Sequence, residues 1–187
     1  MEQSLTDTGG GSPTRGSGQL APYRVPVAPG WVDYNGHMSE WAYLLVMGNN
    51  SDAFFRYVGI DEAYRAGGAS LYTVETHIHN YLEASEGELL TLTLQVLGCD
   101  SKRVHVAHRI LREDDELIAT GEQMLLHVDT TAGRTSVMPE AVQARVTDVA
   151  QAHRDMERPQ WVGHVMAIPG DMEGPIAAGD LRSEGTG

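Results

Sequence analysis

The sequence predicts an α+β domain in which an antiparallel sheet wraps around one long helix and a second helix follows. Two patterns predict it: apolar residues at helical spacing over about residues 39–58, and strand-like runs between residues 71 and 128. With 187 residues, 41% of them hydrophobic, the chain is long enough for one globular core and too short for two. We therefore expect a single domain over residues 21–157.

Both ends of the chain differ in composition from this domain. Residues 1–20 are dominated by Gly, Ser, Thr and Pro, which predicts a disordered tail. Residues 158–187 predict a C-terminal extension that is partly disordered. Its apolar residues are candidates to dock on the body: Trp161, Val165, Met166 and Ile168.

The first two elements are a short strand and the long helix. Residues 23–27 predict a strand at the edge of the sheet, where Pro26 is tolerated. Ser39 is the expected N-cap of the helix. Gly48 in mid-helix costs about 1 kcal/mol in propensity and indicates close packing against the sheet. The apolar residues expected on the buried face are Trp41, Leu44, Leu45, Phe55 and Val58.

Four strands are expected next. Residues 71–82 are rich in Thr, Val, Ile and Tyr. Residues 90–96 alternate Leu or Val with Thr or Gln, which is typical of a strand buried on one face. Residues 104–110 and 117–128 follow, separated by turn-forming residues.

A C-terminal helix is expected after the strands. Pro139 begins it, and Val142, Val146 and Val149 share one face. One long helix followed by consecutive antiparallel strands favours a sheet that wraps the helix and buries it on most sides.

Composition and charge argue against several partners. The formal net charge of −13 argues against nucleic acid, because a phosphate backbone needs a basic face. No apolar run approaches the roughly 20 residues that span a bilayer, so no membrane partner is expected. Cys99 is the only cysteine, which excludes an internal disulfide, and the first residues lack a secretory or transit pattern. We expect a cytoplasmic location.

A loop before the long helix carries the residues best suited to catalysis. Asp33, Asn35, Gly36 and His37 precede the first helical turn. Unpaired N–H groups and the positive end of the dipole favour an oxygen with developing negative charge there. The loop is therefore where an acyl carbonyl is expected to bind, and Gly36 is expected to adopt positive φ or let the ligand approach the backbone.

A second polar face is expected on the strand that follows the helix. Glu75 is the second carboxylate candidate, because Val74, Thr76 and Ile78 are expected to point inward on the opposite face, which leaves Glu75 to face the helix of a neighbouring subunit. The alternative is an ordinary exposed glutamate. The residues that share the parity of Glu75 are His77, His79, Tyr81 and Glu83.

Metal and serine chemistry are not expected. Two imidazoles at His77 and His79 can chelate a metal, but no third ligand stands at a recognisable spacing and no H-E-x-x-H motif is present. The G-x-S-x-G pattern of a serine nucleophile is also missing. We predict neither a metal nor a cofactor.

Aromatic and basic residues are the candidates for binding a ligand. Aromatic faces attract quaternary ammonium groups by cation–π contacts worth about 2 kcal/mol when desolvated, although core packing is the alternative for Trp41. For an anionic ligand, Lys102 and Arg103 at a turn are the first candidates, and scattered surface basics are the alternative. The other cations are Arg109, Arg112 and Arg134. The aromatics near the loop are Trp31, Tyr34, Trp41, Tyr43 and Tyr72.

This order of elements, with Trp31-x-Asp33-x-Asn35-Gly36-His37-Met38, resembles the hot-dog fold thioesterases in the branch of 4-hydroxybenzoyl-CoA and acyl-ACP thioesterases. Residues 70–78 and 122–129 resemble more narrowly the betainyl-CoA thioesterases of carnitine breakdown. The resemblance implies a hot-dog fold, a coenzyme A thioester substrate, and a homodimer or dimer of dimers. It also implies hydrolysis of betainyl-CoA to betaine and CoA. A G-x-G-x-x-G fingerprint is missing, so a dehydrogenase partner would be a separate protein.

The resemblance also implies roles for the loop. Asp33, Asn35 and His37 match a catalytic Asp-x-Asn-x-His pattern, and Glu83 is the nearest match to its further glutamate. Thioester hydrolysis requires an attacking water or carboxylate, which Asp33 can supply. Asn35 can hold the water or the carbonyl, and His37 can orient Asp33 or take a proton. The alternatives are turn caps for Asp33 and Asn35 and a structural imidazole for His37.

Two other functions stay open at this point. One is a thioesterase for another short-chain or aromatic acyl-CoA. The other is a non-catalytic hot-dog protein that binds acyl-CoA without hydrolysing it.

Overall fold

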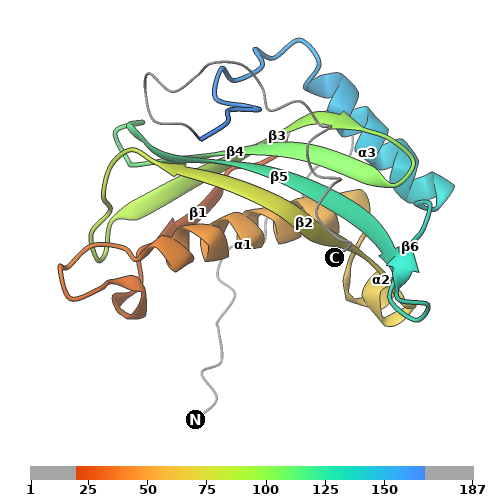
Figure 1. Cartoon of the computed structure of the whole chain (residues 1–187), viewed down its shortest axis with the longest axis horizontal. Coiled ribbons are helices and arrows are strands. Elements are labelled where there is room, and N and C mark those ends of the chain that lie inside the picture. Colours follow the sequence, from red (N-terminus) through yellow and green to blue (C-terminus); the bar gives the residue numbers. More distant parts are fainter. Residues whose placement is uncertain (1–19, 167–187) are drawn as a thin grey trace, which may run out of the picture.

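A computed structural model describes residues 20–166 of the chain. One six-stranded antiparallel sheet curves over a long helix (Figure 1), with strand order β1-β3-β4-β5-β2 and β6 paired to β5. Most of the expected N-terminal tail, and Ile168 of the expected extension, lie outside the described residues. The strands are β1 (Tyr23–Pro26), β2 (Ala69–Asn80), β3 (Leu89–Cys99), β4 (Arg103–Leu111), β5 (Leu117–Asp129) and β6 (Arg134–Thr135).

The helices follow the predicted order with small additions. The long helix and the C-terminal helix were both expected, and Ser39 is the N-cap residue of α1, although its side chain makes no capping hydrogen bond. Asp61 caps α2 by accepting from the Tyr64 N–H. The 3-10 turn, α2 and β6 were not predicted, because each is too short to show a period in the sequence. The helices are η1 (Pro29–Trp31), α1 (Glu40–Val58), α2 (Glu62–Ala66) and α3 (Glu140–Ala152).

The core lies between α1 and the concave face of the sheet. On β3 the residues at even positions from Leu90 to Val96 are buried, as the alternation predicted. Opposite residues of antiparallel neighbours point to the same face, so the β3–β4–β5 register carries this inner face across the sheet. A Cβ at Gly121 of β5 would collide with the Met47 sulfur, so this glycine lets α1 approach the sheet closely.

The buried face of α1 differs from the predicted one in its first half. Ala42, Val46 and Met47 are buried, whereas Gly48 is exposed and its Cβ position has no neighbouring atom within 4 Å. The prediction that Gly48 packs against the sheet is wrong, and Gly121 has that role. The predicted core residues that lie on the exposed side are Trp41, Leu44 and Leu45, with exposed fractions of 52%, 46% and 39%.

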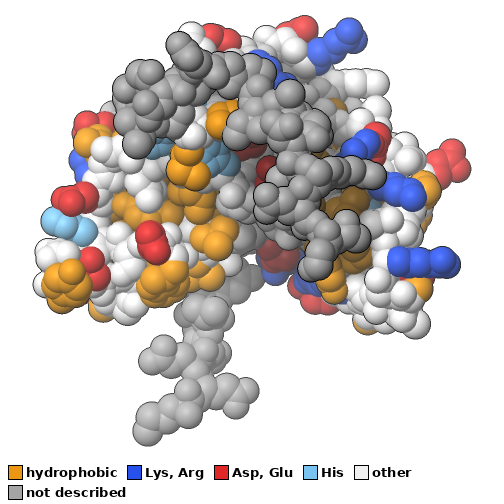
Figure 2. All heavy atoms as spheres, viewed as in Figure 1, with side chains coloured by type: hydrophobic (Ala, Val, Ile, Leu, Met, Phe, Trp, Pro, Cys, Tyr) orange, Lys and Arg blue, Asp and Glu red, His pale blue; other side chains and the backbone are white. Residues whose placement is uncertain are grey.

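In the view of Figure 1, α1 runs below β2, the last strand of the sheet. Hydrophobic side chains gather on the face formed by α1 and β2 (Figure 2). Val74 is 55% exposed, because a bulge between Thr73 and Glu75 interrupts the alternation of β2, and the prediction that Val74 points inward is wrong. Beyond the bulge, Thr76 lies opposite Gln123 and Ile78 opposite Gly121, on the inner face as expected.

The helix α3 closes the core beside β3, and the chain after it covers the outer face of the sheet. The three valines predicted for one face of α3 are buried, and α3 packs against β3 and α1. The chain then returns over the sheet (Figure 1), where Gln95 donates to the Glu157 carbonyl and Gly163 N–H to Glu122. None of the described helices is both long and apolar enough to cross a membrane.

Candidate active site

The loop before α1 is a closed turn held against the connection between β2 and β3. Asp33 N–H donates to the His37 carbonyl at 2.9 Å, and Gly36 N–H donates back to Asp33 at 3.0 Å. Gly36 has φ of 84°, a value that favours glycine, as expected. Met38 N–H donates to the Ala84 carbonyl, which fixes the loop to the β2–β3 connection.

The Asp33 carboxylate caps its own loop. Its Oδ1 accepts from the Asn35 N–H at 2.7 Å and from the His37 N–H at 3.4 Å. Asn35 Nδ2 lies 3.4 Å from Asp33 Oδ2. The turn-capping alternative for Asp33 is therefore present in the structure, and it holds the carboxylate at a fixed place beside the N-terminus of α1 while leaving it exposed.

His37 pairs with Glu83 and makes no side-chain contact with Asp33. His37 Nε2 lies 3.2 Å from Glu83 Oε2, with the two side chains 40% and 73% exposed. An ionised carboxylate can only accept a hydrogen bond, so the pair favours the tautomer in which Nε2 carries the hydrogen and Nδ1 is the free acceptor. Glu83 is thus brought to the loop, as the resemblance implied.

Arg112 holds the segment that carries Glu83. Its guanidinium donates to the Glu83 carbonyl and, at 2.7 Å, to Glu116, and it lies 3.4 Å from Glu88. The sequence marks Arg112 only as one of several scattered cations. Its role comes from the end of β4 meeting the β2–β3 connection, and no local pattern shows that contact.

The aromatic candidates fall into different environments. Tyr34 is 96% exposed at the tip of the loop and Trp41 is 52% exposed on the first turn of α1. Trp31 is half-buried under the loop, where its carbonyl accepts from the Ser39 N–H. Tyr43 is 3% exposed, so its ring lies in the core and faces no ligand in the single chain. This burial raises the pKa of its hydroxyl.

Tyr72 and Glu75 are not brought to the loop in the same chain. The register sets Tyr72 opposite Leu126 and Glu75 opposite Met124, so both point to the outer face of the sheet. Asp33 lies at the helix N-terminus on the other side. In the single chain Glu75 is an exposed glutamate, which was the alternative to a catalytic role.

Lys102 and Arg103 also lie far from Asp33. They stand at the start of β4, whereas Arg112, just beyond the end of β4, contacts Glu83. The eight residue steps of β4 span about 26 Å at about 3.3 Å per residue. Arg103 donates a side-chain hydrogen bond to Asp100 in the preceding turn. This hydrogen bond and the one from the Lys102 N–H lower the pKa of the Asp100 carboxyl to about 2.

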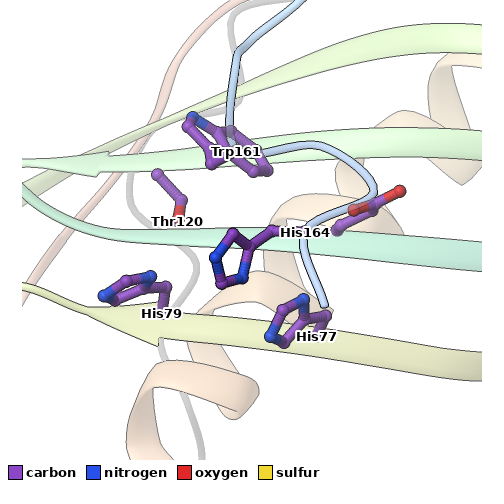
Figure 3. Close-up of a pocket in the computed structure, with 6 residues that line it drawn as sticks. His77, His79, Thr120, Trp161 and His164 are labelled. Carbon is purple, nitrogen blue, oxygen red and sulfur yellow. The ribbon is translucent and has the colours of Figure 1, made fainter. Parts of the chain in front are cut away.

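A second polar cluster lies on the outer face of the sheet. Glu122 Oε1 lies 2.6 Å from His105 Nε2, while its Oε2 accepts from the Gly163 N–H at 2.7 Å. His77 and His164 stack with ring centroids 6.2 Å apart. Among residues 20–166, no three His, Cys, Asp or Glu side chains are arranged to hold a metal ion. The small pocket in Figure 3 is lined by His77, His79, Thr120, Glu122, Trp161 and His164.

His108 is a buried titratable group that sequence analysis did not single out. It is fully buried between α1 and the sheet, where Asn50 and Ser51 contact its two ring nitrogens at 3.1 and 3.3 Å. Gln123 completes the cluster at 3.1 Å. Burial lowers the pKa of His108 to about 4, so the imidazole is neutral and acts as a satisfied core residue.

The chain is similar to known thioesterases in sequence. Residues 27–146 match the family described as the thioesterase-like superfamily. The chain is 50% identical over 144 residues to the L-carnitine dehydrogenase/betainyl-CoA thioesterase of Agrobacterium fabrum, covering 77% of this chain and 30% of that protein. It is 41% identical over 152 residues to the betainyl-CoA thioesterase of Pseudomonas aeruginosa, covering 80% of this chain and 96% of that protein.

The comparison of folds agrees. The Staphylococcus aureus protein SAV2348, solved in complex with CoA, matches with a TM-score of 0.76 and 25% identity, over 81% of this chain and 96% of that one. The chain spans only about 30% of the length of the Agrobacterium fabrum relative. The family match covers well over half of the chain, and the sheet curled around α1 is the expected hot-dog fold. The chain belongs to the thioesterase-like superfamily.

Proposed function

We propose that this protein hydrolyses betainyl-CoA to betaine and CoA. The observation that carries the proposal is its 41% identity to the Pseudomonas aeruginosa betainyl-CoA thioesterase over nearly all of that protein. The closed loop of Asp33, Asn35 and His37 at the start of α1 supports it from the geometry. The reaction consumes only water and needs no cofactor.

Asp33 is the proposed base or nucleophile. Two loop N–H groups fix Oδ1, so Oδ2 is the oxygen left to take a proton from water or to attack the carbonyl. Asn35 Nδ2 donates to Oδ2 at 3.4 Å, and its second N–H is the proposed donor to the attacking oxygen or to the carbonyl. The cap and the catalytic role are compatible, because the hydrogen bonds that close the turn also aim the carboxylate.

The first turn of α1 is the proposed oxyanion site. The Ser39 hydroxyl makes no capping hydrogen bond, so it does not occupy the first N–H groups of the helix. Those N–H groups and the helix dipole stabilise the negative oxygen that forms when the thioester carbonyl is attacked. The His37–Glu83 pair stands beside this site, ready to accept or return a proton at His37 Nδ1.

Trp41 is the proposed contact for the trimethylammonium group. Its ring is half exposed on the same first turn of α1, within one turn of the proposed oxyanion site. Betaine places its cation one methylene from the carbonyl, so a short reach is sufficient. An aromatic face attracts such a cation by about 2 kcal/mol when water is excluded. Tyr34 is the second candidate.

A homodimer is the proposed working unit. The far edge of β2 has no partner strand among the described residues, and Leu44 and Leu45 expose apolar surface on α1. A second copy that adds its own β2 in antiparallel sense covers both. This antiparallel pairing also reverses the direction of the partner subunit. The end of the partner's sheet that carries Lys102 and Arg103 therefore approaches the loop of the first subunit, where these two cations bind the phosphates of CoA.

We place the enzyme in the cytoplasm, where CoA esters are made and where a single free cysteine, Cys99, stays reduced. The test is the release of CoA thiol from a panel of betainyl-, acetyl-, butyryl- and benzoyl-CoA. Betainyl-CoA is expected to give the highest kcat/KM. A faster aromatic or neutral ester would make this a thioesterase for another acyl group, and tight binding without thiol release would make it a non-catalytic binder.

A further inference from the structure

The end of the described chain forms an arm on the outer face of the sheet. This C-terminal arm, residues 157–166, is tied to β3 through Gln95 and to β5 through Glu122, which accepts from the Gly163 N–H. It reaches β2, where His164 stacks on His77 at an interplanar angle of 22° (Figure 3). The arm therefore crosses the outer face from α3 to the edge strand.

The arm leaves apolar side chains exposed where it reaches that edge. Val165 is 69% exposed and Met166 is 82% exposed, directly after the residue that stacks on His77. Tyr72, on the outer face of the same edge strand, is 52% exposed. Exposed apolar groups beside an unpaired strand edge are typical of a surface that another chain covers.

Antiparallel pairing of two β2 strands relates these residues. When β2 (Ala69–Asn80) overlaps fully with its copy about a two-fold axis, Tyr72 falls opposite the partner subunit's His77. Both residues point to the outer face, because they lie opposite Leu126 and Glu122, which are four residues apart on β5. The arm that stacks on His77 in one subunit thus ends next to Tyr72 of the partner subunit.

We propose that the C-terminal arm clasps a second copy of this chain, with Val165 and Met166 packing on the partner subunit's Tyr72 across the β2 seam. The inference rests on the proposed dimer, and it adds a contact that the two paired β2 strands do not supply. Tyr72 of the same chain is five residues from His77, about 17 Å along the strand at about 3.3 Å per residue, so the partner's ring is the nearer one.

Directed disulfides test the clasp. In a Cys99→Ser background, Tyr72→Cys and Met166→Cys chains with different affinity tags are co-expressed and oxidised. We expect a covalent heterodimer joining the two tags, in larger yield than the disulfide dimers of either variant alone. Val137→Cys in place of Met166→Cys is the matched control, since Val137 is 56% exposed away from the arm, and it should not cross-link.

A second measurement separates the clasp from the dimer itself. Val165→Ser/Met166→Ser should raise the dimer dissociation constant about tenfold or more by sedimentation, without unfolding the domain. If the protein is a dimer but shows neither the cross-link nor the weaker association of the variant, the proposed clasp is wrong and the proposed dimer is not. A compact monomer overturns both, and a disulfide within a doubly substituted chain shows that the arm covers its own Tyr72.

Discussion

Glu83 Oε2 lies 3.2 Å from His37 Nε2, and this contact joins the connection after β2 to the loop before α1 that is proposed to be catalytic. The two residues are 46 positions apart, and Arg112 holds the same connection through the Glu83 carbonyl. The pairing favours the tautomer of His37 with its hydrogen on Nε2, which leaves Nδ1 as the acceptor for the proposed proton transfer.

Removing the charge of Glu83 should lower turnover more than it affects the fold. In Glu83→Gln the carboxylate beside His37 is replaced by a neutral amide of the same size, so the imidazole loses the negative charge that faces it. We expect a loss of about tenfold in kcat at neutral pH and an unchanged melting temperature. An unchanged kcat would show that His37 and Glu83 are a structural pair.

Trp41 should act on the charged acyl group rather than on CoA. Trp41→Leu keeps an apolar side chain and removes the ring face, so kcat/KM for betainyl-CoA should fall about tenfold or more. The uncharged isostere 3,3-dimethylbutanoyl-CoA should lose much less. Equal losses for both substrates would mean that Trp41 shapes the site without binding the cation, and Tyr34→Leu is the matched variant to examine next.

His108 should make the domain acid-sensitive. Its folded pKa of about 4 lies below the ordinary value of 6.5, so the neutral form is bound by the fold. The stability linked to this group is fully present above about pH 6.5 and is lost as the pH falls toward 4, by up to about 3 kcal/mol. Urea titrations of the wild type and of His108→Gln should show this dependence in the wild type and a weaker one in the variant.

Gly121, at the contact of α1 with the sheet, and Gly48, on the exposed side of α1, should respond oppositely to alanine. Gly121→Ala places a Cβ against the Met47 sulfur and should destabilise the fold by about 1–3 kcal/mol. Gly48→Ala meets no atom of the chain within 4 Å and should stabilise α1 by up to about 1 kcal/mol. Denaturant unfolding measures both. Destabilisation by Gly48→Ala would place another chain in close contact with α1 there.

The strands and their order of appearance could be predicted because their signals are local. The alternation of 90–96 and the valine spacing of α3 each report one buried face, and the structure confirms both. The buried face of α1 could not be predicted from apolarity alone. Trp41, Leu44 and Leu45 keep helical spacing but lie on the exposed side of α1, where the ligand is the proposed partner of Trp41 and a second chain is that of Leu44 and Leu45.

Only the part of the candidate site that lies in one continuous segment of the chain could be predicted from the sequence alone. Asp33, Asn35, Gly36 and His37 are contiguous, so the loop was visible in the sequence, and the resemblance added Glu83. Arg112 was not distinguishable from other cations, because its contacts depend on where β4 ends. Glu75 was expected to face a neighbouring subunit, and this stays a prediction. The inward orientation expected for Val74 was wrong, because the bulge between Thr73 and Glu75 has no clear local signal.

The most direct test of the account is thiol release from betainyl-CoA by the wild-type protein and by Asp33→Asn, which keeps the side-chain shape and the two backbone N–H bonds to Oδ1 but removes the basic oxygen. We predict rapid, saturable release by the wild type and a kcat lower by about 100-fold or more in the variant, with an unchanged melting temperature. A folded Asp33→Asn protein that retains most of the wild-type kcat would contradict the proposed mechanism, and a wild-type protein inactive on betainyl-CoA would contradict the proposed function.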